Sequence, residues 1–366
     1  MKIVDLCAYA PKSAIKAGEA IKNGKYMFFT SSNDKSKRYS DYQHNCEAII
    51  MGTGGNATLH YYNGKFSTST DCVVLLPNES IRCKFLYYFF LHNIAVLEKG
   101  FKGAGLKHTN KNYINNIEIN TVPDIETQDK VIKALDLACN LVRFHQRQLK
   151  KLDELVKFRF IEMFVTDKNV CNWSQVRISD VSTDMRTGPF GSALHHDEFV
   201  DSGVFVLGID NAVENRFSYN RMRYITEEKY NQLKRYTVYP GDVIITIMGT
   251  VGRSAVIPQD MPKAISTKHL ACITPDSAVV DPCFLSSAFQ MHPAIRLQLQ
   301  NQCKGAIMDG LNLTIIKELR FQLPPIDQQK QFSEFVEQTD KSKFVIQQAL
   351  DKAQLLFDSL MQKYFG

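Results

Sequence analysis

Polar and basic side chains gather in the sequence segments that separate short apolar runs, and their types suit contacts with nucleic acid. In the first 120 residues, TSSNDKSKRYSDY (30–42) and ATLHYYNGKF (57–66) are such segments. Lysine and arginine contact phosphates, whereas arginine, asparagine and glutamine carry the paired donors and acceptors that read base edges. The candidate DNA-contacting residues here are Ser32, Asn33, Lys35, Lys37, Arg38, Asn56, Tyr61, Lys65 and Lys107.

A second group with the same chemistry follows after residue 180. Its candidate DNA-contacting residues are Arg186, Ser192, Asn211, Arg216, Arg221, Arg223, Arg253 and Lys268. A solvated surface role is the more common one for any single residue of this kind, so the prediction rests on the two groups together.

Motifs for catalysis are missing. Glycine-rich MGTGGN (51–56) lacks the Lys-Ser/Thr of a P-loop and is no GxGxxG, so a tight turn after a strand is favoured, as for its counterpart MGTVG (248–252). The chain has no Asn/Asp-Pro-Pro-aromatic motif of a base-flipping methyltransferase, no HExxH and no GxSxG. Asp210, Glu227 and Lys229 could be read as a nuclease pattern, but a helix start in TEEKYNQL is the favoured interpretation. We therefore predict no catalytic residue and no metal site.

Composition indicates a folded, multi-domain chain. The 366 residues are 44% hydrophobic and 22% charged, and the length favours two or three domains. The net charge of +6 is uneven, since residues 1–120 hold 15 basic and 9 acidic residues and residues 166–322 hold 16 of each. No apolar run is long enough to span a bilayer, no signal peptide is evident, and the nine cysteines form no CxxC pair. We expect a cytoplasmic protein with free thiols and no membrane contact.

An internal repeat supplies the frame that must position these residues. The segment VPDIETQDKV (122–131) returns as LPPIDQQKQF (323–332), and the register of 201 positions then holds to Phe164 and Phe365. Both copies lead into about 40 residues with apolar side chains at alternating steps of four and three, which predicts two long helices that pack as a coiled coil. Periodicity does not tell a parallel pair from an antiparallel one. The stripes include Val131, Leu135, Leu149, Leu152 and Val156 in the first helix and Val336, Ile346, Leu350, Phe357 and Leu360 in the second.

The rest of each half reads as α+β, because short β-rich runs such as YMFFT, EAIIM, VFVLGI and DVIITIMG alternate with turn signals and are followed by short helical pieces. We expect domain 1 over 1–121, a long spacer helix over 122–165, domain 2 over 166–322 and a second spacer helix over 323–366.

With these features in place, the chain resembles the specificity (S) subunit of a Type I restriction-modification system. The resemblance lies in LPPIDQQKQFSEFVEQTDKSKF with its upstream partner VPDIETQ, in TGPFGSALHHDEFVDSGVFVLGIDNAVENRF, in GDVIITIMGTVGRSAVIP and in STKHLACITP. The opening half, from GKYMFFTSS to YYNGKFSTSTDCVVLLP, is similar to another variety of the same recognition domain.

The resemblance implies two β-rich mixed target recognition domains in a pseudo-twofold arrangement, separated by two long helices packed as an antiparallel coiled coil. Each domain would read one half-site of a bipartite, asymmetric sequence in double-stranded DNA. It also implies a non-catalytic chain that docks two methyltransferase (modification) subunits and restriction subunits, with the helical stripes also serving in docking. No cofactor would bind this chain, and S-adenosylmethionine, ATP and magnesium would belong to the partners.

Two alternatives stay open. One is a non-catalytic coiled-coil adaptor that joins two protein partners without reading DNA, for which the neutral second half is the main argument. The other is an enzyme whose site is built from scattered residues. One departure within the repeat is that Asp124 and Thr127 of the first copy stand where the second has Pro325 and Gln328, so the two helix starts differ.

Overall fold

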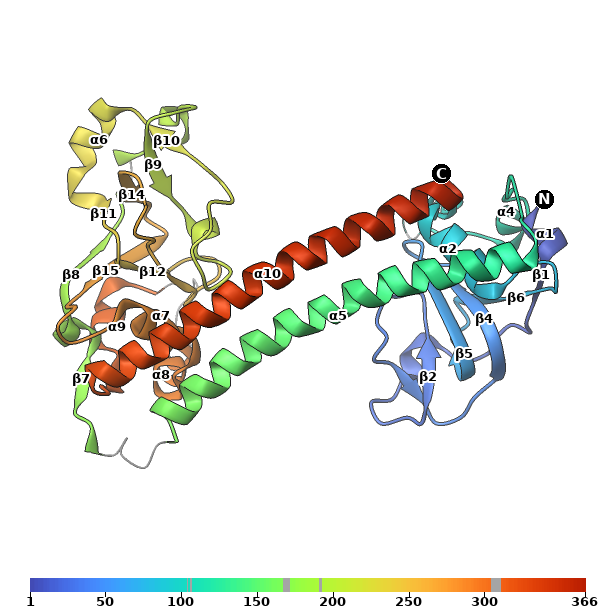
Figure 1. Cartoon of the computed structure of the whole chain (residues 1–366), viewed down its shortest axis with the longest axis horizontal. Helices are drawn as coiled ribbons and strands as arrows, with labels where there is room; N and C mark the ends of the chain where they lie inside the picture. Colours follow the sequence, from blue (N-terminus) through green and yellow to red (C-terminus); the bar gives the residue numbers. More distant parts are fainter. Residues whose placement is uncertain (104, 106, 167–171, 191–192, 304–310) are drawn as a thin grey trace. The chain divides into compact units, whose positions relative to one another are not determined.

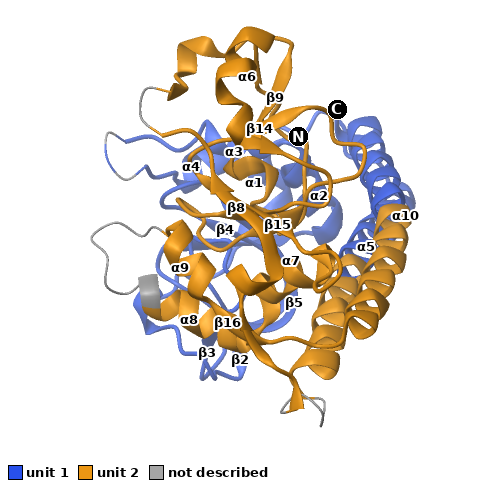
Figure 2. Ribbon diagram, turned by 90° about the vertical axis from the view of Figure 1, so that its left-hand side faces the viewer, with its two compact units in different colours: residues 1–147, 347–366 blue, residues 148–346 orange. Residues whose placement is uncertain are grey.

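The computed structural model describes the chain except for residues 104, 106, 167–171, 191–192 and 304–310. The chain divides into two compact units, residues 1–147 with 347–366 and residues 148–346 (Figures 1 and 2). Each unit therefore holds one globular domain together with a stretch of both long helices. The sequence placed domain boundaries at the ends of the helices, whereas compactness divides the chain within them.

The two long helices form where the repeat predicts them. Helix α5 spans Ile125–Phe164 and helix α10 spans Ile326–Phe365, each of 40 residues, so that both bounds of α10 lie 201 positions after those of α5. Asp124 caps the start of α5 by accepting hydrogen bonds from the Thr127 backbone N–H at 2.8 Å and the Thr127 hydroxyl at 3.1 Å. At the start of α10 the Gln328 N–H donates to the Pro325 carbonyl at 3.0 Å, so the difference seen in the sequence is a difference in capping.

Side-chain contacts within each unit give the helices their direction. In unit 1, Val131 and Leu135 near the start of α5 share a core with Phe357 and Met361 near the end of α10. In unit 2 it is the end of α5 that packs against the start of α10. There Phe160 near the end of α5 packs on Phe332 in the first two turns of α10, with ring centroids 5.5 Å apart. The pair is antiparallel, which confirms what the family resemblance implied.

An ion pair is built into the seam between the helices in unit 2. The ammonium group of Lys343 lies 2.8 Å from Asp153 of α5 and 3.2 Å from Asp340 of its own helix, and its side chain is 20% exposed. Burial acts against this charge, but the two carboxylates outweigh it and raise the pKa of Lys343. A polar residue in such a stripe favours one register and one partner at some cost in stability.

The globular part of unit 1 is built around a six-stranded sheet in the order β1–β6–β4–β5–β2–β3. Strands β2 and β5 are parallel, and the other neighbours are antiparallel. The strands are β1 (Cys7–Tyr9), β2 (Tyr26–Phe29), β3 (Arg38–Tyr39), β4 (His44–Gly52), β5 (Leu59–Thr68) and β6 (Cys72–Pro77). The short helices are α1 (Ile3–Leu6), η1 (Ala17–Glu19), α2 (Cys83–His92), α3 (Ile94–Glu98) and α4 (Lys111–Asn115).

Both faces of this sheet are covered, as the side-chain alternation of β4 shows. Ile49 and Met51 join the core that includes helix α2 and the long helices. Ala48 and Ile50 point to the other face and join a smaller core around Phe66.

Unit 2 contains two four-stranded sheets, ordered β10–β9–β14–β11 and β13–β12–β15–β8, and a two-stranded sheet of β16 and β7. The strands are β7 (Gln175–Arg177), β8 (Ser182–Thr187), β9 (Val204–Leu207), β10 (Tyr224–Ile225), β11 (Thr237–Val238), β12 (Val243–Thr246), β13 (Ser254–Val256), β14 (Ala264–Ser266), β15 (Leu270–Pro275) and β16 (Arg320–Gln322). The short helices are η3 (Ile178–Val181), η5 (His196–Glu198), η6 (Ile209–Asn211), α6 (Glu227–Leu233), η7 (Lys234–Tyr236), α7 (Pro282–Met291), α8 (Pro293–Cys303) and α9 (Leu313–Glu318). The α+β prediction is confirmed for both units.

Buried glutamines tie each long helix to the globular domain that precedes it. Gln128, in the first turn of α5, is fully buried. Its amide nitrogen donates to the carbonyls of Ser80 at 3.1 Å and Pro123 at 2.8 Å, and its amide oxygen accepts from the Arg82 N–H at 2.7 Å. This glutamine therefore satisfies three backbone groups just before α2 and α5.

Gln329 repeats the arrangement in unit 2 and is also fully buried. Its amide nitrogen donates to the carbonyls of Val279 at 3.2 Å and Pro324 at 2.7 Å, while its oxygen accepts from the Asp281 N–H at 2.8 Å. The two glutamines are 201 positions apart, and the residues they hold before α2 and α7 are 199 apart. We call these two residues the glutamine clamps.

Replacing a clamp should destabilise its unit. Gln128→Leu or Gln329→Leu leaves three backbone groups without partners in a buried place, and we expect each to lower the free energy of unfolding by about 3 kcal/mol. Urea unfolding measures this loss. Gln331→Leu, at an exposed position in the same turn of α10 as Gln329, is the matched control. Equal stability of the clamp and control variants would contradict the role assigned to the clamps.

Candidate nucleic-acid interface

The loop between β2 and β3 is shaped by its own basic residues. Lys37 donates from its ammonium group to the hydroxyls of Thr30 at 2.9 Å and Ser32 at 3.2 Å. The Arg38 guanidinium donates to the carbonyls of Lys35 at 2.8 Å and Lys37 at 2.9 Å. These bonds hold the loop and leave Asn33 and the Lys35 side chain exposed.

Loops of unit 1 meet at Ser31 and at Gly55. The Ser31 hydroxyl donates to the Asp71 carbonyl at 2.6 Å and accepts from the Gly54 N–H at 3.4 Å. Gly55, at φ +84°, donates its N–H to the Lys107 carbonyl at 2.9 Å. We call residues 30–38, 52–56 and 107–109 the unit 1 loop cluster. It brings together the predicted residues Ser32, Asn33, Lys35, Lys37, Arg38, Asn56 and Lys107.

Tyr61 and Lys65 do not join this cluster. The Tyr61 hydroxyl donates to Glu47 at 2.6 Å, on the side of β5 that faces α2. The Lys65 ammonium lies 4.5 Å from the centre of the Tyr42 ring. Neither contact involves the loops of the cluster, although Tyr61 lines a groove together with the candidate Lys35.

Unit 2 has a corresponding cluster, in which loops approach each other too closely for side chains at two glycines. A Cβ at Gly188 would lie 2.2 Å from the Thr267 backbone, and one at Gly208 would lie 2.6 Å from the Arg223 guanidinium. The Thr267 N–H donates to the Leu207 carbonyl at 3.0 Å. We call residues 188, 208–211, 223, 249–253 and 266–269 the unit 2 loop cluster. It carries the predicted residues Asn211, Arg223, Arg253 and Lys268, and the last two are exposed.

The unit 2 loop cluster also holds polar groups that the sequence analysis did not predict to contact DNA. Asp210 Oδ2, Ser266 Oγ, Thr267 Oγ1 and His269 Nδ1 are buried and make no hydrogen bond to the described part of the chain. Buried polar atoms of this kind require a water molecule or a ligand. One signal existed in the sequence, because Ser266-Thr267 repeats Ser69-Thr70.

Electrostatics at this cluster favours a neutral histidine. Burial lowers the pKa of His269, and the nearby charges of Lys268 and Arg223 lower it further. Arg223 itself donates to Asp210 at 2.8 Å and is only 17% exposed. A neutral imidazole has one donor and one acceptor, so His269 is suited to a base edge and Lys268 to a phosphate.

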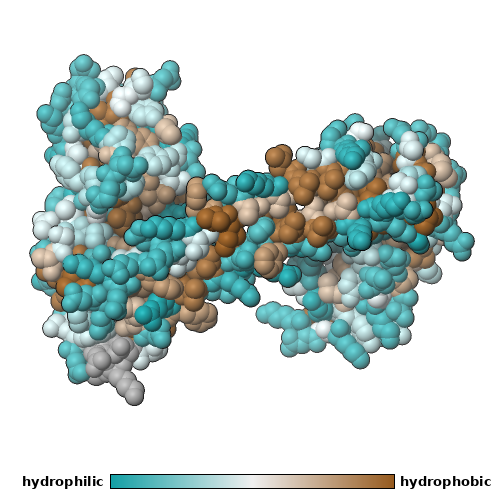
Figure 3. All heavy atoms as spheres, viewed as in Figure 1, coloured by the Kyte–Doolittle hydropathy of each residue, from teal (hydrophilic) through white to brown (hydrophobic). Residues whose placement is uncertain are grey.

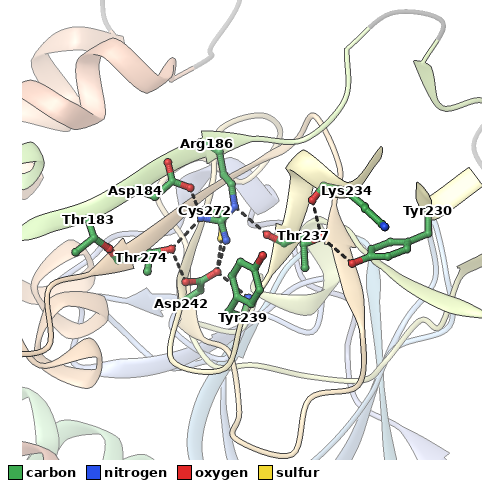
Figure 4. A network of polar contacts seen from close by, with 10 residues as sticks. All are labelled: Thr183, Asp184, Arg186, Tyr230, Lys234, Thr237, Tyr239, Asp242, Cys272 and Thr274. Atoms are coloured by element: carbon green, nitrogen blue, oxygen red, sulfur yellow. Dashed lines mark hydrogen bonds and ion pairs between the residues drawn. The ribbon is translucent and has the colours of Figure 1, made fainter. Parts of the chain in front are cut away.

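Arg186 has a different role from the one predicted. Its guanidinium donates to Asp184 at 2.7 Å, to the Thr274 hydroxyl at 2.8 Å and to the Thr237 carbonyl at 2.9 Å, and it pairs with Asp242, as Figure 4 shows. Asp242 is 1% exposed and also accepts from the thiol of Cys272, whose pKa is raised by burial and by that carboxylate. Arg186 thus links β8 and β15 to β11 of the other sheet, and we do not retain it as a DNA contact.

Three further candidates of unit 2 are either buried or lie in another loop. Asn211 is fully buried and hydrogen-bonds the Gly208 N–H and the Ser218 carbonyl, both at 2.8 Å, so its role is also structural. Arg216 and Arg221 are exposed in the loop between η6 and β10. Ser192 lies outside the described residues.

Both loop clusters occupy the same place in their sheets. In unit 1 the cluster follows β4, whose last residue Gly52 pairs with Cys72 at the start of β6. In unit 2 it follows β12, whose last residue Thr246 pairs with Leu270 at the start of β15. The glycine-rich segments after β4 and β12 are turns with positive φ at Gly55, Gly249 and Gly252, as the sequence indicated.

The described residues form neither a metal site nor a membrane-spanning helix. Outside the gaps in the description, no group of three or more His, Cys, Asp or Glu side chains is placed to hold a metal ion. Within those limits no helix is long and apolar enough to cross a membrane. The described cysteines include seven free thiols, of which Cys72, Cys83 and Cys272 are buried.

Fold and site together define a duplicated protein with two similar polar loop surfaces on a shared pair of helices. The model of the family "Type I restriction modification DNA specificity domain" matches residues 1–154 and 172–354. The chain therefore belongs to this family, in agreement with the prediction of a non-catalytic specificity subunit. The two matched stretches correspond to the two halves of the internal repeat.

Individual relatives agree with this membership. The chain is 21% identical over 349 residues to the EcoBI specificity subunit of Escherichia coli, covering 87% of this chain and 73% of that protein. It is 21% identical over 314 residues to the MjaVIII specificity subunit of Methanocaldococcus jannaschii, covering 80% and 72%. Its fold is similar to the crystal structure of the S subunit of a Type I system from M. genitalium, with a TM-score of 0.69, 14% identity and coverage of 100% and 95%.

Removing one exposed cation of the unit 2 loop cluster, Lys268, should weaken DNA binding. Because one phosphate contact releases about one counterion, Lys268→Ala should lower affinity for any duplex and reduce the slope of log K against log salt by about 0.9. Fluorescence anisotropy at several salt concentrations measures both. Lys317→Ala, an exposed lysine of α9, is the matched control. A slope unchanged by Lys268→Ala, or lowered equally by Lys317→Ala, would count against this contact.

Proposed function

We propose that this chain is the DNA-recognition subunit of a Type I restriction-modification complex and that each unit reads one half-site of a bipartite, asymmetric sequence. The observation that carries the proposal is the pair of loop clusters at equivalent strand ends. The two clusters match in position but differ in the side chains they present. Unit 1 presents Asn33, Lys35 and Lys107, and unit 2 presents Lys268 and His269. Two unlike surfaces on one frame imply two unlike half-sites.

Within each cluster we assign two kinds of contact. The exposed lysines and Arg253 bind phosphates and set the register on the duplex. Asn33 and Asn56 in unit 1 and the neutral His269 in unit 2 have the donors and acceptors needed for base edges. The unpartnered polar atoms around His269 support a surface that gains its hydrogen bonds from a ligand.

We also propose that the long helices dock the partner subunits. Large apolar side chains remain exposed on both helices in each unit (Figure 3). In unit 1 they are Leu137, Leu141, Phe144, Leu355 and Leu356, and in unit 2 they are Leu155, Phe158, Phe344 and Val345. Phe144 and Val345 are 201 positions apart, as are Leu155 and Leu356. A duplicated apolar surface suits two copies of one partner.

The partners in this proposal are two methyltransferase subunits and the restriction subunits, which bring S-adenosylmethionine, ATP and magnesium. The adaptor alternative explains the apolar helix surfaces equally well. It does not account for the two polar loop clusters, and DNA binding by the loops is therefore the property that distinguishes the two.

Mapping methylated bases across the genome tests DNA reading directly. Cells that contain the chain with its modification subunits should carry a two-part methylated motif that disappears when the chain is removed. Replacing residues 1–121 with the recognition domain of a relative should change one half of this motif and keep the other. A motif that persists without the chain, or changes in both halves after the exchange, would refute the assignment.

To test docking, negative charges are introduced into the exposed apolar surface of one unit at a time. Leu137 and Leu355 are 65% and 68% exposed in unit 1, so Leu137→Asp with Leu355→Asp should leave the fold intact and remove one bound modification subunit of two. Native mass spectrometry of the reconstituted complex counts the copies. Lys133→Asp and Lys157→Asp at exposed polar positions of α5 serve as controls. Two copies still bound to the doubly substituted chain would exclude this surface as a docking site.

A further inference from the structure

Apart from Lys35, a groove in unit 1 is lined by residues that belong neither to the loop clusters nor to the exposed apolar side chains of the long helices. It lies between β5 and α2 of the globular domain and the stretches of α5 and α10 in the same unit, and it has a volume of about 430 Å³. Small-molecule sites occupy roughly 300 to 1,000 Å³, so the groove has room for a compact organic ligand. Its distinctive lining residues are Lys35, Tyr61, Tyr87, Tyr88, Asp136 and Arg143.

The wall of the groove is held in place by a chain of polar contacts. Asp136 accepts from the Tyr88 hydroxyl at 2.6 Å and from the Lys84 ammonium at 2.7 Å. Lys84 Nζ also lies 5.3 Å from the centre of the Tyr61 ring, and the Tyr61 hydroxyl donates to Glu47. Burial is the largest cause of the raised pKa values of Tyr61 and Tyr88, and their carboxylate partners add to it. Both phenols therefore stay neutral, and their hydroxyl groups donate to carboxylates of the domain and not to a ligand.

Two aromatic rings and two positively charged side chains of the groove are available to contact a ligand. The Tyr61 and Tyr87 rings are partly exposed, and their centroids are 5.7 Å apart at an interplanar angle of 45°. Lys35 and Arg143 are exposed, and neither side chain has an ion pair or hydrogen bond to the described residues. Since Lys84 is neutralised by Asp136, the uncompensated charge of the lining residues is positive. A ligand that complements this surface has a planar ring and an anionic group.

The duplicate in unit 2 lacks these residues, although it keeps the frame around them. The glutamine clamps align α2 with α7 at an offset of 199, which puts Cys283, Ser286 and Ser287 where unit 1 has Lys84, Tyr87 and Tyr88. On the long helices, at an offset of 201, Phe344 stands in the place of Arg143. Packing of a globular domain on its helices therefore requires neither the rings nor the cations, and the groove is an added feature of unit 1.

We propose that this groove binds one nucleotide, with the base against Tyr61 and Tyr87 and the phosphate at Lys35 and Arg143. Base stacking on aromatic rings and phosphate binding by arginine and lysine are the interactions that these four side chains offer. Asn140, Gln146 and Gln354 also line the groove and supply amide donors and acceptors for the edge of the base. The nucleotide is either a free one or an unpaired one in DNA. Lys35 also belongs to the unit 1 loop cluster, but the groove uses no other residue that we assign to half-site reading.

The test uses the whole chain and ATP as the probe for a free nucleotide, with binding measured by isothermal titration calorimetry. Arg143→Ala and Tyr87→Leu should each weaken ATP binding at least about tenfold, as expected for loss of a phosphate contact or a stacking ring. Arg147→Ala, one turn further along α5 and outside the groove, should leave it unchanged. Crosslinking of 8-azido-ATP to the unsubstituted chain should label the peptides that contain Tyr61 or Tyr87, which keeps the test independent of any folding defect in a variant.

A second arm distinguishes the sources. A single-stranded DNA of ten nucleotides replaces ATP. The binding of the same variants to this strand is compared with their binding to a fully paired duplex. Weakened binding of ATP alone assigns a free nucleotide, and weakened binding of the single strand alone assigns an unpaired nucleotide of DNA. Failure of the groove variants to change either, or displacement of ATP by polyglutamate as effectively as by ADP, would overturn the proposal. Loss of duplex binding through Lys268→Ala with ATP binding intact would bear on the loop clusters only.

Discussion

Burial of the first turn of each long helix against its own globular domain is the interaction on which the rest of the structure depends. A 40-residue helix with a continuous apolar stripe could pack on its globular domain in more than one register. One end must be fixed to select a single register. Gln128 and Gln329 fix it, because an amide with no solvent contact must find partners for its donors and acceptor, and here those partners are backbone groups at the starts of two helices. Each long helix is thereby an extension of its domain.

Duplication of this frame separates what is shared from what has diverged. Both halves keep the clamp, the helix bounds and a glycine turn beside the paired strand ends. They differ in the residues those turns present and in charge, and in unit 2 several arginines are used in ion pairs, as Arg186 and Arg223 are. The ligand-facing positions are free to change because the strands and helices below them do not rely on them.

Residue type alone was an uneven guide to the candidate site. Lys35, Lys107 and Lys268 were found from the sequence and are exposed in the loop clusters, because lysine is rarely buried without a partner. Arg186 and Asn211 were assigned to DNA contact on the same reasoning, yet an arginine or an asparagine serves equally well inside a network of buried hydrogen bonds. The sequence does not indicate His269, since its interest comes only from a buried ring nitrogen without a partner among the described residues, which no sequence pattern reports.

Apolar periodicity and turn residues act over a few neighbours, so they predicted the two long helices to within a few residues and several of the strands, among them β2, β4, β9 and β12. The 201-residue register also predicted the duplication. The antiparallel direction of the helices was decided only by tertiary structure. An apolar stripe of period 3.5 is the same whichever way its partner runs. The direction follows from the core that Val131 and Met361 share and from the packing of Phe160 on Phe332. The groove of unit 1 was likewise invisible, since Lys35, Tyr87 and Arg143 come from three separate parts of the chain and become one surface when the domain closes on its helices.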